Sequence, residues 1–246
     1  MMSPEVERPL PPYLQVLTRI RRQILSGELA PGDRVPSERQ ICEEWGVSRT
    51  TATKVLGALR YEGLVSSAQG VGTTVKARVL QGGGDRMRRL RSSGTLYRKD
   101  EKVAITNADL VTAPDYVADA LGLDAGSDVI RRTRTVSDSQ GVAAASTSWL
   151  PGSLTETSPL LLTTERIGEG GTVRYVEETA GRRAVRGRDA LTSRLAAADE
   201  VRLLGLTSPA AVLVAQTVLW DQNGEVIEFG EDVSPAGRIW STEFDM

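Results

Sequence analysis

The segment from residue 29 to residue 76 constrains the fold of this 246-residue chain more than any other, because it carries the boundaries of two short helices and a glycine-tipped hairpin. Ser37 stands three residues before a glutamine, the spacing of a helix-capping box, and predicts a helix over about Ser37–Trp45. Gly46 ends that helix and Ser48 caps the next one. Two helices joined by so tight a turn form a helix-turn-helix.

The elements on either side complete a winged helix. An amphipathic run over Tyr13–Ser26 predicts a first helix, and Leu64–Ser67 with Thr73–Lys76 predicts a β-hairpin wing. In such a module the start of the last helix reaches base edges in the major groove, while the wing approaches the minor groove or phosphates. We therefore expect double-stranded DNA as a partner, with Arg49 as the leading base reader.

A simpler alternative exists for the same pattern. Three helices and a hairpin can be a packing solution that never contacts DNA, with Arg49 and Lys54 on a solvated face. The loop, the helix cap, the helical periodicity and the wing follow one another in the order a DNA-binding module needs, which favours DNA binding.

Charge divides the chain into two parts. Residues 1–99 hold 17 basic and 9 acidic side chains, whereas residues 100–246 hold 13 and 23. A basic part suits phosphates, and an acidic part is repelled by DNA and must serve another purpose. We expect a DNA-binding domain over residues 10–78, a flexible linker rich in glycine and arginine over 79–99, and a second domain over 100–246.

The composition argues against an enzyme. The chain contains no histidine, which removes histidine acid–base pairs, Ser-His-Asp triads and His-ligated metal sites together. It also lacks a G-x-x-x-x-G-K-[ST] phosphate loop. We expect no cofactor and no metal, although carboxylate or lysine chemistry stays formally possible. Without an apolar stretch of signal-peptide or membrane-spanning length, we expect a cytoplasmic protein.

The second domain is predicted to mix strands and helices. Strands that follow one another by short turns, with helices inserted, predict an antiparallel sheet in an α+β domain. The predicted strands are Val103–Ala113, Asp128–Val136, Ala143–Leu150, Ala211–Trp220 and Glu225–Val233, and the predicted helices are Asp115–Leu121, Ser153–Thr163, Thr172–Thr179 and Ala196–Leu204.

The first domain resembles the winged-helix domain of the GntR family of bacterial transcription regulators. The resemblance rests on LAPGDRVPSERQ, GVSRTTATKVLGALRYEGLV and GVGTTV. The family commonly has an arginine where this chain has Thr53, so the operator sequence cannot be transferred from relatives. The DNA-binding positions that we predict are Arg39, Ser48, Arg49, Thr50, Thr51, Thr53, Lys54, Gln69 and Gly70.

From about residue 100 the chain resembles the UTRA effector-binding domain of the HutC subfamily of GntR regulators, whose fold is similar to chorismate lyase. The resemblance is carried by VIRRTRTV, STSWLPGSL, DEVRLLGL and AVLVAQTVLWDQNGEVIEFGEDV. It implies a domain that binds a small metabolite, often a sugar phosphate or a carboxylate, and thereby alters operator affinity. By position, Arg134 matches the residue that grips the anionic group, and Glu228 the carboxylate that accepts hydrogen bonds from the ligand.

The chemistry of these residues fits an effector site. A guanidinium fork suits phosphate or carboxylate oxygens, and a nearby carboxylate discriminates polar substituents. Arg132 shares the strand face of Arg134 and could be a second clamp, and Ser148 could add a hydroxyl donor. The glycine-rich residues 168–172 could cradle an anion with backbone N–H groups or be a plain loop.

Three functional readings follow. The first is a dimeric transcription regulator, expected to be a repressor, which binds an inverted-repeat operator under the control of an anionic effector. A dimer is expected because one winged helix reads only a few base pairs. In the second reading the C-terminal half only dimerises, and Arg134 and Glu228 form an ordinary surface ion pair. The third hypothesis is a lyase-like enzyme. Whether Arg134 and Glu228 face one cavity distinguishes the effector-controlled regulator from the protein whose C-terminal half only dimerises.

Overall fold

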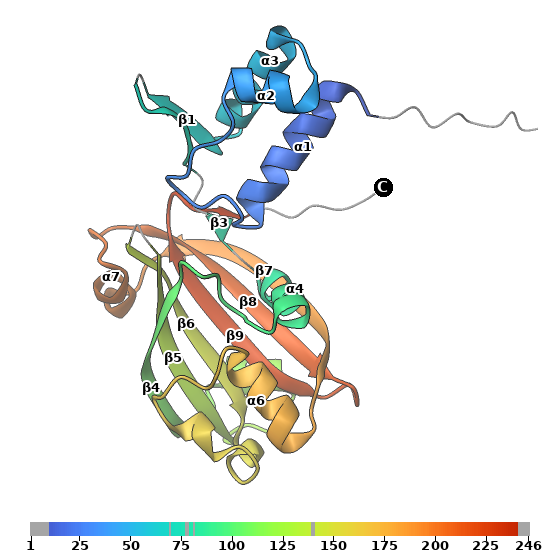
Figure 1. Ribbon diagram of the computed structural model, residues 1–246. Helices are drawn as coiled ribbons and strands as arrows, with labels where there is room; N and C mark the ends of the chain where they lie inside the picture. Colours follow the sequence, from blue (N-terminus) through green and yellow to red (C-terminus); the bar gives the residue numbers. More distant parts are fainter. Residues whose placement is uncertain (1–9, 69, 77–78, 81, 139–140, 241–246) are drawn as a thin grey trace, which may run out of the picture. The chain divides into compact units, whose positions relative to one another are not determined.

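The structure, a computed structural model, describes residues 10–68, 70–76, 79–80, 82–138 and 141–240 (Figure 1). The chain divides into two compact units, one reaching to Val79 and the other spanning Leu80–Trp240. Among the described residues, no helix combines the length and the apolar character needed to cross a lipid bilayer.

The first unit is a three-helix domain with a small wing sheet, as predicted. Its core is apolar, and Ile20, Ile41, Val55 and Leu59 have no exposed surface. The Ser37 hydroxyl accepts from the Gln40 N–H, and the Gln40 side chain accepts from the Ser37 N–H, so the predicted capping box is confirmed. The elements are α1 (Pro12–Leu25), α2 (Glu38–Trp45), α3 (Arg49–Tyr61), β1 (Val65–Ala68) and β2 (Gly72–Val75).

The second unit is built on a six-stranded antiparallel sheet with the strand order β4-β5-β6-β9-β8-β7. Together with the first unit it confirms the predicted α+β fold class. Short strands β3 (Val79–Leu80) and β10 (Ile239–Trp240) pair separately. The sheet strands are β4 (Lys102–Thr112), β5 (Asp128–Asp138), β6 (Gly141–Pro151), β7 (Ala184–Leu195), β8 (Ala211–Asp221) and β9 (Val226–Pro235).

Helices cover both faces of this sheet. On one face lie α4 (Gly83–Ser93) and α6 (Gly171–Ala180), side by side in Figure 1, with Leu90 and Val173 packed against Leu219. On the other face α5 (Asp115–Leu121) packs on Val218 and Phe229. Helix α7 (Ala198–Leu204) covers Val212, Val214 and Val233, whose parity along the strands places them on the α5 face.

The predicted flexible linker is wrong over most of its length. Residues 83–93 form helix α4, which belongs to the second unit and buries Leu90. Its glycines serve close packing, because a Cβ atom on Gly83 would lie 2.6 Å from Thr217 Oγ1 and 2.8 Å from Asp189 Oδ1. The glycine run therefore serves close packing against the sheet and not flexibility.

Two further differences concern the second unit. Strand β7 was not predicted, because most of its residues are exposed and the alternation of apolar and polar residues is weak. The single helix predicted over Ser153–Thr163 is wrong: the segment holds two short 3₁₀ helices, η1 (Gly152–Thr155) and η2 (Pro159–Leu162). Pro159, which cannot donate a backbone hydrogen bond, begins the second of them.

Candidate functional site

The N-terminus of α3 divides the predicted DNA-binding residues into two groups. Ser48 caps the helix, with its hydroxyl accepting from the Thr51 N–H at 3.2 Å and lying 2.9 Å from Thr51 Oγ1. These two residues therefore hold the start of the helix. Arg49, Thr50 and Thr53 are exposed and available to a partner.

The exposed side chains of α3 make only weak contacts within the first unit. The Arg49 side chain is 87% exposed, and its Nε lies 3.3 Å from Glu38 Oε2. Thr53 donates to the other oxygen of Glu38 at 3.0 Å, and Lys54 Nζ lies 4.1 Å from the centre of the Tyr13 ring. Exposed ion pairs contribute about 0–1 kcal/mol, so phosphates or bases can displace Glu38 from Arg49 at little cost.

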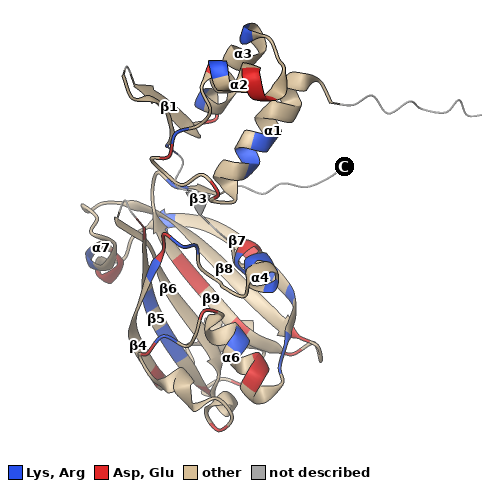
Figure 2. Ribbon diagram, in the orientation of Figure 1, with Lys and Arg blue, Asp and Glu red and all other residues tan. Residues whose placement is uncertain are grey.

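A polar groove lies between α2 and the wing. Arg39, whose side chain is 83% exposed, lines it together with Arg19 and Arg34, and Val71–Thr73 borders it from the wing. Figure 2 marks in blue the positions of Lys and Arg along the ribbon of α1, α2 and α3. Sequence reasoning did not identify Arg19 and Arg34, although both are basic residues beside the predicted module. Gly70 has a φ of +79°, and Gln69 lies outside the described residues.

In the second unit, a stripe of polar side chains occupies the sheet face beneath α4 and α6. Cross-strand pairing places Arg134 opposite Ser146, Arg132 opposite Ser148, and Glu228 opposite Leu219. Side chains two residues apart share a face, so these groups lie together where an ordinary core would be apolar. Ser146 and Ser148 are 2% and 0% exposed, and Glu228 is 8% exposed. Burying so many polar groups costs free energy, which points to a site with a function.

A chain of hydrogen bonds connects Arg134 to α6. Arg134 Nη1 donates to Ser148 Oγ at 2.8 Å, and Ser148 Oγ donates to Glu228 Oε1 at 2.6 Å. The second oxygen of Glu228 accepts from Thr172 Oγ1, on α6, at 3.1 Å. The structure thus brings together three residues predicted from the sequence, Arg134, Ser148 and Glu228, and adds Thr172 from the glycine-rich segment.

A small cavity of about 50 Å³ lies beside this chain. Arg134, Glu228 and Asp232 line it, together with Arg86 from α4 and Tyr97. Burial lowers the pKa of the Arg134 guanidinium, but Tyr97, Asp232 and Glu228 raise that pKa by more, so Arg134 stays charged. Arg134 and Glu228 therefore face one cavity.

Sequence reasoning missed three of these residues. Asp232 carried a usable signal, because it continues the alternation of Glu228 and Gly230 on β9. Tyr97 and Arg86 carry none, because both lie in the glycine- and arginine-rich stretch that is predicted to be a linker.

Arg132, which the sequence suggested as a second clamp, uses its guanidinium nitrogens on backbone carbonyl groups. It is 2% exposed, and its Nη1 donates to the carbonyl oxygens of Leu160, Leu161 and Thr163 at 2.6–3.0 Å. Its Nη2 donates to the carbonyl of Glu165 at 3.2 Å. Arg132 thus holds the η2 segment in place. It also borders a cavity of about 30 Å³ with Arg134 and the glycine-rich residues, so it supports the site from its wall.

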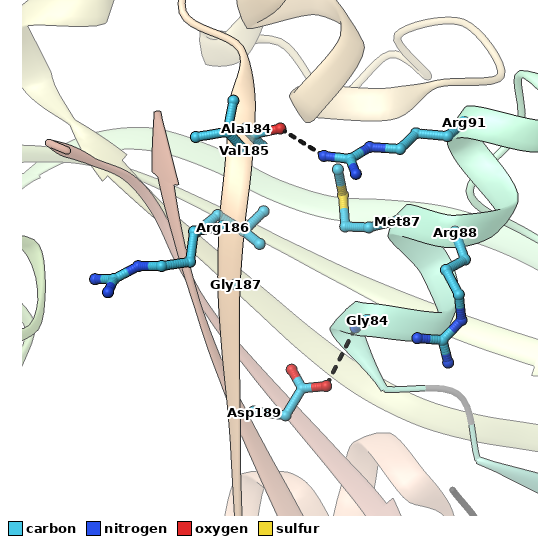
Figure 3. Close-up of a pocket in the computed structure, with 10 residues that line it drawn as sticks. Gly84, Met87, Arg88, Arg91, Ala184, Val185, Arg186, Gly187 and Asp189 are labelled. Carbon is cyan, nitrogen blue, oxygen red and sulfur yellow. Dashed lines mark hydrogen bonds between the residues drawn. The ribbon is translucent and has the colours of Figure 1, made fainter. Parts of the chain in front are cut away.

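A groove of about 220 Å³, larger than the cavity at Arg134, lies between α4 and β7 (Figure 3). Its charged side chains do not point toward a common centre. Arg91 donates to the carbonyl of Ala184 at 2.9 Å, and the Gly84 N–H donates to Asp189 at 3.1 Å. Arg186 points away from α4 in Figure 3 and stacks on the Trp220 ring at 4.0 Å. The donors of this groove are dispersed or already used, so the cavity at Arg134 is the stronger candidate.

Comparisons with protein families agree with the division into two units. Residues 12–75 match the model of the gntR family of bacterial regulatory proteins, and residues 98–239 match the model of the UTRA domain.

The similarity to individual known proteins extends over nearly the whole chain. The repressor NagR of Bacillus subtilis is 26% identical over 248 residues, covering 96% of both chains. The HTH-type transcriptional regulator SCO4628 of Streptomyces coelicolor is 29% identical, covering 95% of this chain and 93% of its own. Among solved structures, PhnF from Mycobacterium smegmatis shares the fold with a TM-score of 0.61 and 22% identity, over 94% of this chain and 99% of that chain.

Proposed function

Because this chain belongs to the GntR family of bacterial transcription regulators, in the HutC subfamily that carries a UTRA domain, we propose that a small anion bound at Arg134 controls its affinity for an operator. The chain is a helix-turn-helix transcription regulator and not an enzyme. The identity of the bound molecule, the sign of regulation and the assembly on DNA are parts of the proposal.

On the DNA side, two copies of the chain bind an inverted repeat. Arg49 reads a base edge from the start of α3, supported by the exposed hydroxyls of Thr50 and Thr53, and Arg39 contacts phosphate from α2. Lys54, Ser48, Thr51 and the wing at Gly70 complete the surface. The exposure of Arg49 and its weak pairing with Glu38 support this assignment.

One observation supports the effector assignment above the others: Arg134 and Glu228 line the same cavity but do not form a direct ion pair. Ser148 stands between Arg134 and Glu228, which leaves part of the guanidinium for an anion and part of the carboxylate for ligand donors. The ordinary surface ion pair considered from the sequence would be exposed, whereas Glu228 and Ser148 are buried.

Repression is the sign that we propose. NagR, which is similar to this chain over 96% of its length, is named a transcriptional repressor. Binding of the anion would shift the conformational equilibrium of the second unit and so change the affinity of the winged helices for the operator. Such an effect is a coupling between two binding sites.

The test is operator binding by fluorescence anisotropy, with DNA that flanks the gene and a panel of phosphate esters and carboxylates. At least one anion should change the operator dissociation constant of the parent, and Arg134→Gln should bind operator but not respond. Arg131→Gln is the matched control, because Arg131 lies three residues before Arg134 on the same strand but pairs with Asp109 on the opposite sheet face. A full response in the Arg134 variant would remove Arg134 from the site, and no response of the parent to any anion would favour a domain that only dimerises.

A further inference from the structure

Helix α4 carries an arginine whose hydrogen-bonding groups are left unused. Arg86 lines the cavity of Arg134, and its Nε and Nη1 atoms are buried with no hydrogen-bond partner in the part of the chain that the structure describes. The residue as a whole is half-buried, so it is these two nitrogens that are withdrawn from solvent. Buried charged donors without acceptors are rare in folded proteins and call for an explanation.

Arg134 has the same deficiency on the other side of the cavity. Its Nη1 is satisfied by Ser148, but its Nε is buried and has no acceptor among the described residues. The positive charge of Arg134 also acts to lower the pKa of Arg86, so the two guanidinium groups repel each other. Three guanidinium nitrogens without acceptors, from two arginines that line one cavity, form a site where the oxygens of an anion would find donors.

The carboxylates already in the cavity bind hydroxyl groups of the chain, and none of them accepts a hydrogen bond from Arg86 Nε or Nη1 among the described residues. The two oxygens of Glu228 accept from Ser148 and Thr172, and Asp232 accepts from the Ser146 hydroxyl. The centre of the Tyr97 ring lies 5.0 Å from the centre of the Arg86 guanidinium. This cation–π contact stabilises the positive charge but does not replace an oxygen acceptor for the N–H groups. The missing partner is a set of oxygen acceptors from outside the chain.

We propose that Arg86 is a second anion-binding residue of the effector site, and that it grips, together with Arg134, the phosphate or carboxylate group of the bound molecule. This inference rests on the proposed effector function. It adds a residue outside the sheet and outside the UTRA match at 98–239. Because α4 is the first helix after the DNA-binding unit in the chain, an anion held by Arg86 would act directly on that helix.

The test measures binding of two simple probes, inorganic phosphate and malonate, to the full-length protein by isothermal titration calorimetry at constant ionic strength. Whichever probe binds identifies the preferred group. We expect Arg86→Gln to weaken the binding at least ~10-fold, because charge-assisted hydrogen bonds are lost. Arg88→Gln should bind within about twofold of the parent, since Arg88 lies on the same helix, pairs with Asp85 and has a side chain that is 73% exposed.

A lysine variant addresses the possibility that Arg86 only supports the fold. Arg86→Lys keeps a positive charge near Tyr97 but lacks the guanidinium fork, so a folded Arg86→Lys protein should also lose affinity. Unfolding midpoints of all variants, followed by tryptophan fluorescence, show which of them are folded.

Three results would overturn the inference. If Arg86→Lys or Arg86→Gln bound the probe like the parent while Arg134→Gln had lost it, Arg86 would not contact the anion and the proposed function would stand. If Arg88→Gln lost as much affinity as Arg86→Gln, the effect would be one of general charge. If the parent bound neither phosphate nor malonate, the effector function and this inference would fall together.

Discussion

Arg134 and Glu228 are linked through the single hydroxyl of Ser148, which accepts from Arg134 Nη1 at 2.8 Å and donates to Glu228 Oε1 at 2.6 Å. The linkage orients both charged groups in a buried place. The serine is thus as important to the site as the two charged residues, because it fixes their separation.

Replacing Ser148 with alanine should therefore lower both stability and effector response. The change leaves two buried charged groups short of one partner each, which costs about 1–3 kcal/mol of the free energy of unfolding. Chemical denaturation followed by tryptophan fluorescence measures it. Thr147→Ala is the control, because residue 147 is on the opposite face of β6. Equal unfolding midpoints for the parent and Ser148→Ala would show that the hydroxyl is not needed.

Arg132 should behave as a structural residue. Its guanidinium donates to four backbone carbonyl oxygens in η2 and the residues just after it, and hydrogen bonds to charged groups are worth about 1.5–3 kcal/mol each. Arg132→Gln should lower the unfolding midpoint much more than Arg134→Gln does. A variant with an unchanged midpoint and a lost effector response would instead restore Arg132 as the second clamp.

Sequence patterns predicted the first unit more completely than the second. The capping box at Ser37 and the cap at Ser48 are local signals, so they placed α2 within a residue of its observed bounds and the start of α3 at its observed cap. The site at Arg134 needed the resemblance, because residues on β5, β6 and β9 meet only through long-range strand pairing. Arg86 could not be predicted, since nothing in a run of glycines and arginines shows that it packs on a sheet.

The close packing at the start of α4 gives a further prediction. A Cβ atom on Gly83 would collide with Thr217 and Asp189, whereas a Cβ atom on Gly84 would meet nothing nearer than 3.7 Å. Gly83→Ala should destabilise the docked helix by about 1–3 kcal/mol, the range for overpacking, and Gly84→Ala should be mild. Undocking exposes the α4 arginines to trypsin. Limited proteolysis should cleave the Gly83 variant faster in this helix, and identical cleavage rates for both variants would contradict the packing account.

Acid should remove a stabilising contribution from Asp221. Burial raises the pKa of this carboxyl, but Arg182 at 2.7 Å and the N–H groups of Asn223 and Glu225 lower it by more, so the folded pKa lies below the usual value. A depressed folded pKa stabilises the protein above the unfolded pKa of about 3.9, and that stability is lost as pH falls through the folded pKa.

The difference in free energy of unfolding between the parent and Asp221→Asn should accordingly be largest near pH 7 and shrink below about pH 4. Denaturation curves at pH 7, 5, 4 and 3 measure this difference. A gap that stayed constant over this range would mean that ionisation of Asp221 does not contribute.

Specific operator binding by the full-length protein, measured by fluorescence anisotropy with scrambled DNA as competitor, tests the central claim most directly. Arg49→Ala should weaken specific binding by about 1–3 kcal/mol, because it removes the side chain that we propose reads a base, which is 87% exposed and not needed for folding. Arg60→Ala, at the other end of α3, should bind like the parent. Operator affinity that is unchanged in Arg49→Ala, or binding by the parent that the scrambled competitor abolishes, would contradict the assignment of α3 as the helix that reads the operator.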